Sequence, residues 1–287
     1  MEMAGLVASR FVAFAALALV AGLPLHALTF GVFEAMSRRK RLALALLALV
    51  AAGASVWWAL ESVAAMAGVT LATLDQETFT VVLAATPLGT VMEWRLTALA
   101  AVVLAMIMPL RALRSAVAAL AGGVALATMA WTGHAGASEG GVGTLHRWAD
   151  VLHLLAAATW LGALAGFTVS AFGGDPVIRA QRLAAFARTG SVIVALMLLT
   201  GIVNTYSIAG WPLPLGSRWV WLLALKLGLF AAMLGLAAIN RWKITPALER
   251  GEASAQGHLK RSLMLELGLG LGVVAILAML GVLDPAA

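Results

Sequence analysis

The chain has 287 residues, of which 62% are hydrophobic and only 11% are charged. Soluble domains are about half apolar and about a quarter charged, so this composition indicates an integral membrane protein in contact with lipid. The net charge of +6 comes from short basic clusters between apolar segments, a pattern typical of membrane topology and not of a nucleic-acid-binding surface. The absence of cysteine excludes disulfides, thiolate metal sites and covalent haem attachment through CxxCH.

Eight apolar segments meet or approach the roughly 20 residues with which a helix crosses a bilayer. In chain order they are 11–33, 42–62, 91–110, 115–134, 147–170, 187–207, 219–240 and 262–283. We interpret the first as a retained span, because it lacks the basic region and the small-residue cleavage site of a signal peptide. The sequence therefore predicts an all-α fold, a single membrane domain over 1–287 built as a bundle of eight transmembrane helices.

Basic residues are distributed unevenly between the two sides of this bundle. The loops after the first, third, fifth and seventh spans hold 14 lysines and arginines, and the other side holds 4. Loops rich in lysine and arginine stay in the cytoplasm, so both termini are predicted to be periplasmic. Residues 68–90 combine acidic residues with an apolar tail, which predicts an interfacial helix or lid on the periplasmic side.

The stretch 131–160 concentrates the polar chemistry of the chain. It holds His134, His146, Asp150 and His153 between two long apolar segments. Ionisable groups at the edge of a membrane span are costly to keep there, and they therefore indicate a functional site. His146, Asp150 and His153 are spaced i, i+4, i+7 on one helical face. His146 and His153 lie roughly 10 Å apart along that face, so they bind one ion together only if the helix begins after His146.

A compact metal site would instead join His153 to His134 of the preceding span. Asp150 would then be a ligand or the group that orients a ligand, and His146 would be the first ligand that an incoming ion meets. Trp160, seven residues after His153, continues the same stripe. The alternative to metal binding, for each histidine taken alone, is a structural role as a hydrogen-bonded residue in the packed interior.

Further polar residues fall in the same half of the predicted bundle. Lys226 lies about seven residues, or roughly 10 Å, inside the seventh span. It either extends back to the surface or pairs with Glu61, Glu93 or Asp150. Asn204 and Lys226 are expected along the pathway of the ion. The alternative to pairing with Lys226, for Glu61 and Glu93, is that their carboxylates are solvated among the lipid headgroups.

Without cysteine, histidine and methionine are the soft or borderline ligands that remain, and they suit copper. Most of the 12 methionines are expected to be apolar filler. Histidines on facing helices also suit a b-type haem, with His153 and either His134 or His26 as axial ligands. A sensor or assembly partner that binds copper without moving it is a third hypothesis. No GxxxxGK[ST] motif is present, so no nucleotide and no ATP-driven pumping is expected.

Short motifs in a fixed order resemble the CopD family of bacterial copper-resistance inner-membrane proteins. They are Gly133-His134-Ala135, His153-Leu154-Leu155, Trp160-Leu161-Gly162, Thr200-Gly201 with Asn204, Lys226, Asn240-Arg241 with Pro246, and Glu266. The resemblance covers roughly 80–285, and among ligands it carries over only His134 and His153. It implies a multi-pass inner-membrane protein that is not an enzyme and moves copper from a periplasm-facing site toward the cytoplasm. Its expected partner is a periplasmic copper carrier of the CopC type.

Overall fold

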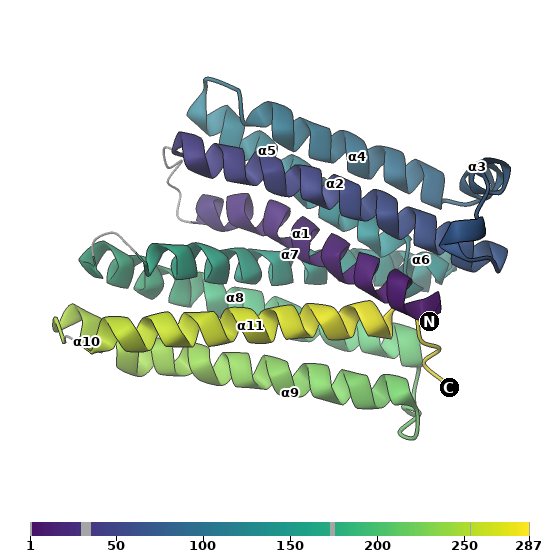
Figure 1. Cartoon of the computed structure of the whole chain (residues 1–287). Coiled ribbons are helices and arrows are strands. Elements are labelled where there is room, and N and C mark those ends of the chain that lie inside the picture. Colours follow the sequence, from purple (N-terminus) through teal and green to yellow (C-terminus); the bar gives the residue numbers. More distant parts are fainter. Residues whose placement is uncertain (1, 30–35, 173–175, 253, 287) are drawn as a thin grey trace.

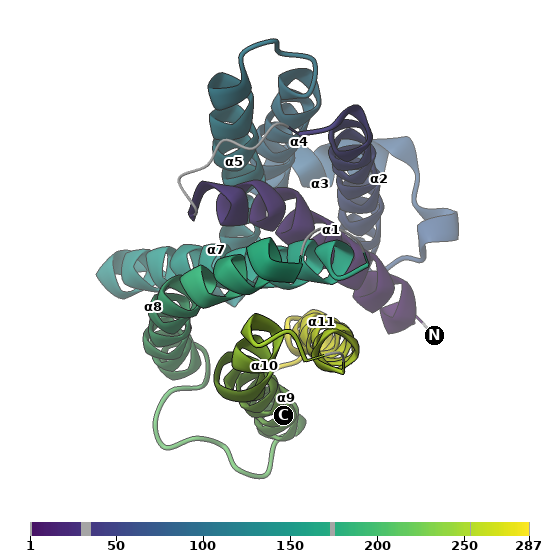
Figure 2. The ribbon, with the colours of Figure 1, turned by 90° about the vertical axis from the view of Figure 1, so that its left-hand side faces the viewer.

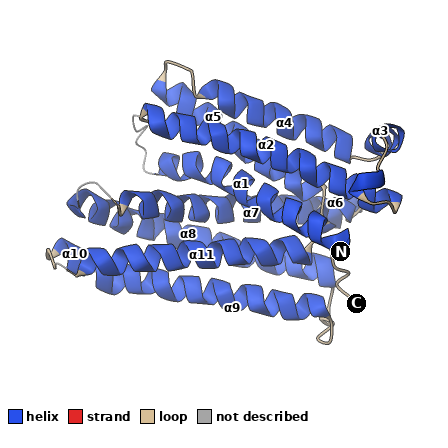
Figure 3. Ribbon diagram, viewed as in Figure 1, coloured by secondary structure: helices blue, strands red, loops and turns tan. Residues whose placement is uncertain are grey.

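The computed structural model describes residues 2–29, 36–172, 176–252 and 254–286, and these form helices joined by loops, with no strand among them (Figure 3). Eight of the described helical segments are long and apolar enough to cross a membrane. The predicted all-α, eight-span fold is therefore confirmed. The chain begins and ends at the same end of the bundle (Figure 1), here called the terminal end. The other end is called the distal end.

The helices follow one another in the chain with these bounds. They are α1 (Glu2–Thr29), α2 (Arg38–Ala67), α3 (Gln76–Ala85), α4 (Leu88–Ala105), α5 (Arg111–Ala127), α6 (His134–Ala137), α7 (Gly140–Ser170), α8 (Pro176–Ala209), α9 (Arg218–Ile239), α10 (Thr245–Glu249) and α11 (Ala255–Leu280). Short 3₁₀ helices at Leu71–Thr73 and Thr128–Trp131 and a π-helical turn at Asn240–Ile244 connect some of them. The spans themselves are α1, α2, α4, α5, α7, α8, α9 and α11 with their short extensions.

Viewed along the helices, the bundle has three layers (Figure 2). Helices α1 and α7 cross the middle, with α2, α4 and α5 on one side and α8, α9 and α11 on the other. Helix α1 contacts α2, α5, α7 and α11, and α9 packs mainly against α11. Because α8 packs on α7, the polar residues of α7 and α8 face each other inside the bundle.

Glycines let α1 and α7 approach closely at the centre of the bundle. A Cβ atom on Gly22 would lie 1.9 Å from the carbonyl oxygen of Ala158, and one on Gly162 would lie 2.1 Å from the carbonyl carbon of Gly22. Small residues at such crossings allow backbone-to-backbone packing within a membrane. This crossing fixes the position of α7 along the axis of the bundle, and with it the position of the histidines that α7 carries.

Two predicted boundaries near the histidines are wrong. Helix α7 begins at Gly140 and not near residue 147, and the helical part of the fourth span ends at Trp131, so His134 begins the separate helix α6. The predicted spans leave residues 135–146 between them, but Gly140, Gly141 and Gly143 form the first turn of α7. The reason is steric, because a Cβ on Gly143 would lie 2.2 Å from the carbonyl oxygen of Ser138, and glycine alone allows that fold-back.

A helix is present within 68–90, as expected, and it is α3 at the terminal end (Figure 1), whereas its place at the membrane interface stays a prediction. Asp75 caps it by accepting a hydrogen bond from the Thr78 backbone N–H at 2.8 Å. The hydrogen bonds from Thr78 lower the pKa of Asp75 below that of a free aspartate. Whether α3 acts as a lid stays a prediction.

Candidate functional site

His134 and His146 lie together at the terminal end, where α6 folds back on the start of α7. Ser138, one turn after His134, donates its hydroxyl proton to the His134 carbonyl oxygen at 3.1 Å. The same hydroxyl lies 3.0 Å from Nδ1 of His146, whose side chain is buried, with 1% of the residue exposed. The two histidines are close enough for their charges to interact. The fold-back of α6 therefore forms a two-histidine pair that sequence spacing did not predict.

The hydrogen bonds of Ser138 favour one tautomer of His146, with its proton on Nδ1. A serine hydroxyl has one proton, and Ser138 uses it on the His134 carbonyl, so its oxygen accepts from Nδ1–H of His146. A neutral imidazole protonated on Nδ1 carries its lone pair on Nε2. That Nε2 atom is buried and has no hydrogen-bond partner among the described residues. His146 thus presents a free lone pair of the kind that binds a metal cation.

Asp150 and His153 form a second polar group, about two turns deeper along α7. Nδ1 of His153 lies 3.0 Å from the Thr200 hydroxyl, and the Asn204 side-chain amide donates to Oδ1 of Asp150 at 3.0 Å. Asp150 and His153 are three residues apart on α7, whereas Thr200 and Asn204 are four apart on α8. Since both spacings put side chains on one helical face, the two contacts form a ladder between α7 and α8.

The same proton argument applies to His153. The Thr200 hydroxyl donates to the Leu196 carbonyl oxygen at 2.6 Å, so it accepts from Nδ1–H of His153. The lone pair of His153 is then on Nε2, and the ring is held in one orientation by its neighbour on α8. Both histidines of α7, His146 buried and His153 half-buried, are therefore oriented as metal ligands, each by a hydroxyl that has no other proton to donate.

Two cations act on Asp150 from different helices. The charges of Lys226 on α9 and Arg10 on α1 both act on the carboxylate. Lys226 also acts on His153, and Asp150 is the carboxylate that acts on Lys226. Of the three carboxylates left open by the sequence, Asp150 is therefore the one whose charge acts on Lys226, and among the described residues the two form no ion pair within 4.0 Å. One carboxylate faces the influence of two basic side chains here.

Arg10 connects the two polar groups. Its guanidinium lies over the Phe14 ring at 5.3 Å and packs on Gly281, while its charge acts on both Asp150 and His134. His134 lies outside the spans. Burial lowers the pKa of His134 below that of a free imidazole, although the Leu283 backbone acts in the opposite direction. His134 is therefore neutral near pH 7, as a metal ligand must be.

The structure pairs the predicted ligands differently from the sequence interpretation. His134 lies with His146, and His153 lies with Thr200, Asp150 and Lys226. Within the described ranges, no three histidine, aspartate or glutamate side chains are grouped as a ready metal site. A single ion shared by His134 and His153 stays a prediction, and the arrangement found favours two positions in succession.

The remaining predicted residues lie away from these groups. Glu61 on α2 accepts a hydrogen bond from the Trp57 indole at 3.0 Å and faces Gly5 of α1, while Glu93 is exposed. Among the described residues, neither carboxylate has a contact with Lys226 or with the histidines. Trp160 is buried two turns beyond His153, with its ring 6.0 Å from that of Phe186.

Sequence reasoning does not identify three residues that orient this site, namely Ser138, Thr200 and Arg10. Of these, only Thr200 belongs to a motif of the family resemblance. The spacing of Thr200 and Asn204 on an otherwise apolar span was a usable signal, because it places two polar side chains on one face. No sequence signal pairs Ser138 with His146, since that contact depends on the fold-back of α6.

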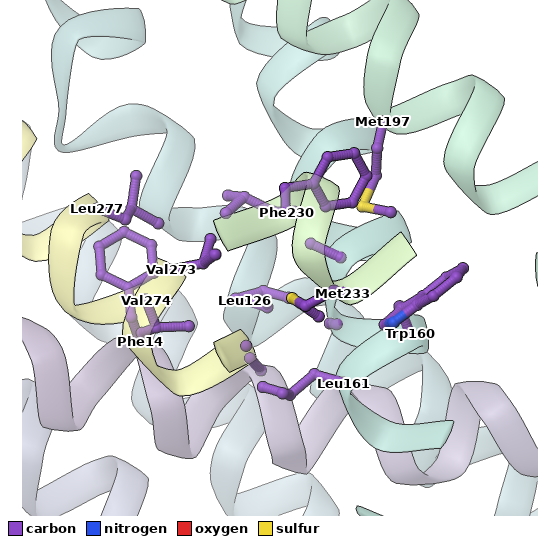
Figure 4. Close-up of a pocket in the computed structure, with 15 residues that line it drawn as sticks. Phe14, Leu126, Trp160, Leu161, Met197, Phe230, Met233, Val273, Val274 and Leu277 are labelled. Atoms are coloured by element: carbon purple, nitrogen blue, oxygen red, sulfur yellow. The ribbon is translucent and has the colours of Figure 1, made fainter. Parts of the chain in front are cut away.

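An apolar cavity of about 90 Å³ lies next to the deeper polar group, toward the middle of the bundle. Met197 lies one turn from Thr200 on α8, and Phe230 lies one turn from Lys226 on α9. Figure 4 shows Met197 and Phe230 on one side of this cavity, with Met233 and Trp160 also lining it. The sulfur atoms of Met197 and Met233 are its soft ligand atoms.

Two family models match the chain. Residues 1–144 match "Copper resistance protein D-like, N-terminal domain", and residues 180–280 match "Copper resistance protein D". Copper resistance protein D of Pseudomonas syringae pv. tomato is 40% identical over 217 residues, which cover 70% of this chain and 69% of that protein. The chain belongs to the copper resistance protein D family.

A second relative is the inner membrane protein YebZ of Escherichia coli (strain K12). It is 31% identical over 160 residues, which cover 55% of each chain. No solved structure matches this chain. With eight membrane-spanning helices and this relative, the protein is a multi-pass inner-membrane protein of a copper-resistance family. The b-type haem alternative finds no support in these matches.

Proposed function

We propose that this protein binds copper on its periplasmic side and moves it toward the cytoplasm, acting as a permease and not as an enzyme. The observation that carries the proposal is the orientation of two histidines on α7, of which His146 is buried and His153 is half-buried. Ser138 and Thr200 hold the Nδ1 protons of His146 and His153, which leaves both Nε2 lone pairs for a cation. Family membership supplies copper as the ion, and imidazole is a suitable ligand for it.

The ion occupies two positions in succession. It is received at the terminal end by His134 and His146, and it then moves about two turns deeper to His153 and Asp150. The donor is a periplasmic copper carrier of the CopC type, which docks at the terminal end near α3 and α6. The second position lies next to the cavity that contains Met197 and Met233, so soft ligands continue along the same line.

Lys226 controls the second position in this proposal. Its charge repels a copper cation at His153, and both cations compete for the single carboxylate of Asp150. Copper binding therefore displaces Lys226 from Asp150. Release of copper restores the Lys226–Asp150 interaction, which prevents the ion from returning and empties the site for the next one. Asn204 keeps Asp150 in place during this exchange.

The proposed direction depends on the orientation of the bundle in the membrane. The bias of basic residues toward the distal end predicts that the terminal end is periplasmic. Reporter fusions after Arg41 and after Ala287 should therefore report the cytoplasm and the periplasm, respectively. Each position should be fused in turn to a reporter that is active only in the cytoplasm and to a reporter that is active only in the periplasm, which checks both assignments. The same compartment for both fusions would contradict the orientation.

Purified protein tests the copper proposal against its two alternatives. We expect copper to remain bound through purification, no Soret absorbance band, and copper uptake into proteoliposomes that contain the protein. A Soret band would favour b-type haem held by His153. Copper binding without uptake would favour a sensor or assembly partner. Empty liposomes and an unrelated membrane protein of similar size are the controls for leakage.

A further inference from the structure

A second, larger pocket lies in the distal half of the bundle, outside the site described above. Its volume is about 320 Å³, and α7, α8, α9, α11 and the turn after α9 enclose it. The rim contains the exposed residues Ser191, Arg241 and Trp242, whereas Glu266 on α11 is buried, with 1% of the residue exposed. The pocket thus joins the distal surface to a carboxylate inside a membrane span.

Glu266 has an amide partner and no cationic one. The Asn240 side-chain amide donates a hydrogen bond to Oε1 of Glu266. Among the described residues, no lysine or arginine nitrogen lies within 4.0 Å of this carboxylate. Arg241, which directly follows Asn240, donates instead to the Ser191 hydroxyl at 3.4 Å and lies over the Trp242 ring. A carboxylate kept inside a span without a cation is costly, so Glu266 either carries a proton or receives a cation that arrives and leaves, and the pocket gives such a cation access.

The local backbone is built to place Asn240 beside Glu266. Residues Asn240–Ile244 form one turn of π-helix, which interrupts the α-helical geometry between α9 and α10. Such turns are rare and occur frequently at functional sites. Asn240 is 6% exposed, and its Oδ1 atom has no hydrogen-bond partner among the described residues. Two oxygen-bearing side chains, each more than nine-tenths buried, therefore meet at one pocket.

The pocket continues the line of the proposed copper route. Trp160 lines both this pocket and the apolar cavity that contains Met197 and Met233. From the terminal end toward the distal end, α7, α8 and α9 thus contribute three successive features. His153 and Asp150 come first, the thioethers of Met197 and Met233 follow, and the wall of the Glu266 pocket is last. His26 of α1 packs edge-on against the aromatic rings of this wall, with Phe186 at 5.3 Å.

We propose that Glu266 and Asn240 form the release site for copper, from which the ion passes through the distal pocket to the cytoplasm. Carboxylate and amide oxygens are weak ligands for copper compared with imidazole and thioether groups. Weak binding suits a last position, because conduction requires sites that an ion can leave. This inference rests on the proposed function, since it assigns the far end of the same pathway.

Copper uptake by proteoliposomes with Glu266→Gln tests the release site. Glutamine keeps the size of the side chain and can still accept from Asn240, so only the charge is lost. Uptake should fall by roughly tenfold or more, because the cation loses its charged ligand at this point. Copper retained by the purified variant should equal that of the wild type. Glu266→Asp should restore part of the uptake, and Glu249→Gln, an exposed change at the same end, should have no effect.

A second measurement does not depend on Glu266. The chain has no cysteine, so Ser191→Cys places a single thiol on the rim of the pocket. A charged methanethiosulfonate reagent should then stop uptake, whereas the same reagent on Ser254→Cys, exposed near the start of α11, should not. Full uptake by both Glu266→Gln and labelled Ser191→Cys would overturn the release site. The proposed function would still stand if the wild type transports copper and His153→Ala does not, so the two failures are distinguishable.

Discussion

Replacing His153 by alanine is expected to abolish copper retention by the purified protein and copper uptake by proteoliposomes. The ring supplies the Nε2 lone pair at the deeper position, and Thr200 holds it in the tautomer that binds a cation. Alanine removes the ligand without adding a charge or a larger side chain. Metal content per chain, measured after purification in the presence of copper, gives the result directly.

Matched variants separate the loss of a ligand from a loss of structure. Asp150→Asn should weaken copper binding by roughly 10–100-fold, the usual effect of changing a group that supports a metal ligand. Thr200→Val removes the hydroxyl that orients His153 and should weaken binding in the same way. His258→Ala changes an exposed histidine at the distal end and should leave metal content unchanged. Wild-type copper content in His153→Ala would refute the deeper position.

Gly162→Ala is expected to destabilise the whole bundle, although it adds only one methyl group. The new Cβ would lie 2.1 Å from the carbonyl carbon of Gly22, which is backbone and cannot turn aside as a side chain can. Helices α1 and α7 would have to separate, and α1 contacts four other spans. We expect at least the ~1–3 kcal/mol typical of an overpacked core, measured as a lower Tm in detergent.

The control for this substitution is Gly235→Ala on α9. A Cβ at Gly235 meets no atom within 4 Å, so the Tm should stay unchanged or rise slightly, because alanine favours helix over glycine. Equal Tm values for Gly162→Ala and Gly235→Ala would show that the α1–α7 crossing does not limit stability. A lower Tm for Gly162→Ala together with weaker copper binding would link this crossing to the position of His146 and His153.

Much of the fold follows from the sequence, because crossing a bilayer requires about 20 apolar residues in a row. All eight spans were identified from this requirement, and the helix α3 from its acidic start and apolar tail. Boundaries were less predictable where glycine is frequent. The start of α7 at Gly140 depends on its close contact with Ser138, and such a contact has no counterpart in local composition.

For the candidate site, the sequence indicated which residues to consider but not which of them meet. Helical spacing correctly predicted that Asp150 and His153 share one face of the helix. It also indicated that His146 is too far from His153 along the helix for the two to share an ion. Spacing could not show that Arg95 is fully buried, with its Nε donating to the Thr128 hydroxyl at 2.8 Å and its guanidinium over the Trp58 ring of α2. That environment depends on how α4 packs against α2, α5 and the 3₁₀ helix after α5.

The amino-acid sequence by itself determined that this is an eight-span membrane protein, that its candidate metal ligands are imidazole, carboxylate and thioether groups and not thiolates, and that it resembles a copper-resistance family. These properties depend on composition and on order along the chain. The tertiary structure decided that His134 lies with His146, that the charges of Lys226 and Arg10 both act on Asp150, and that Glu266 faces a distal pocket. Each of these contacts joins different helices, and their pairing depends on how the helices pack, which spacing within one helix does not specify.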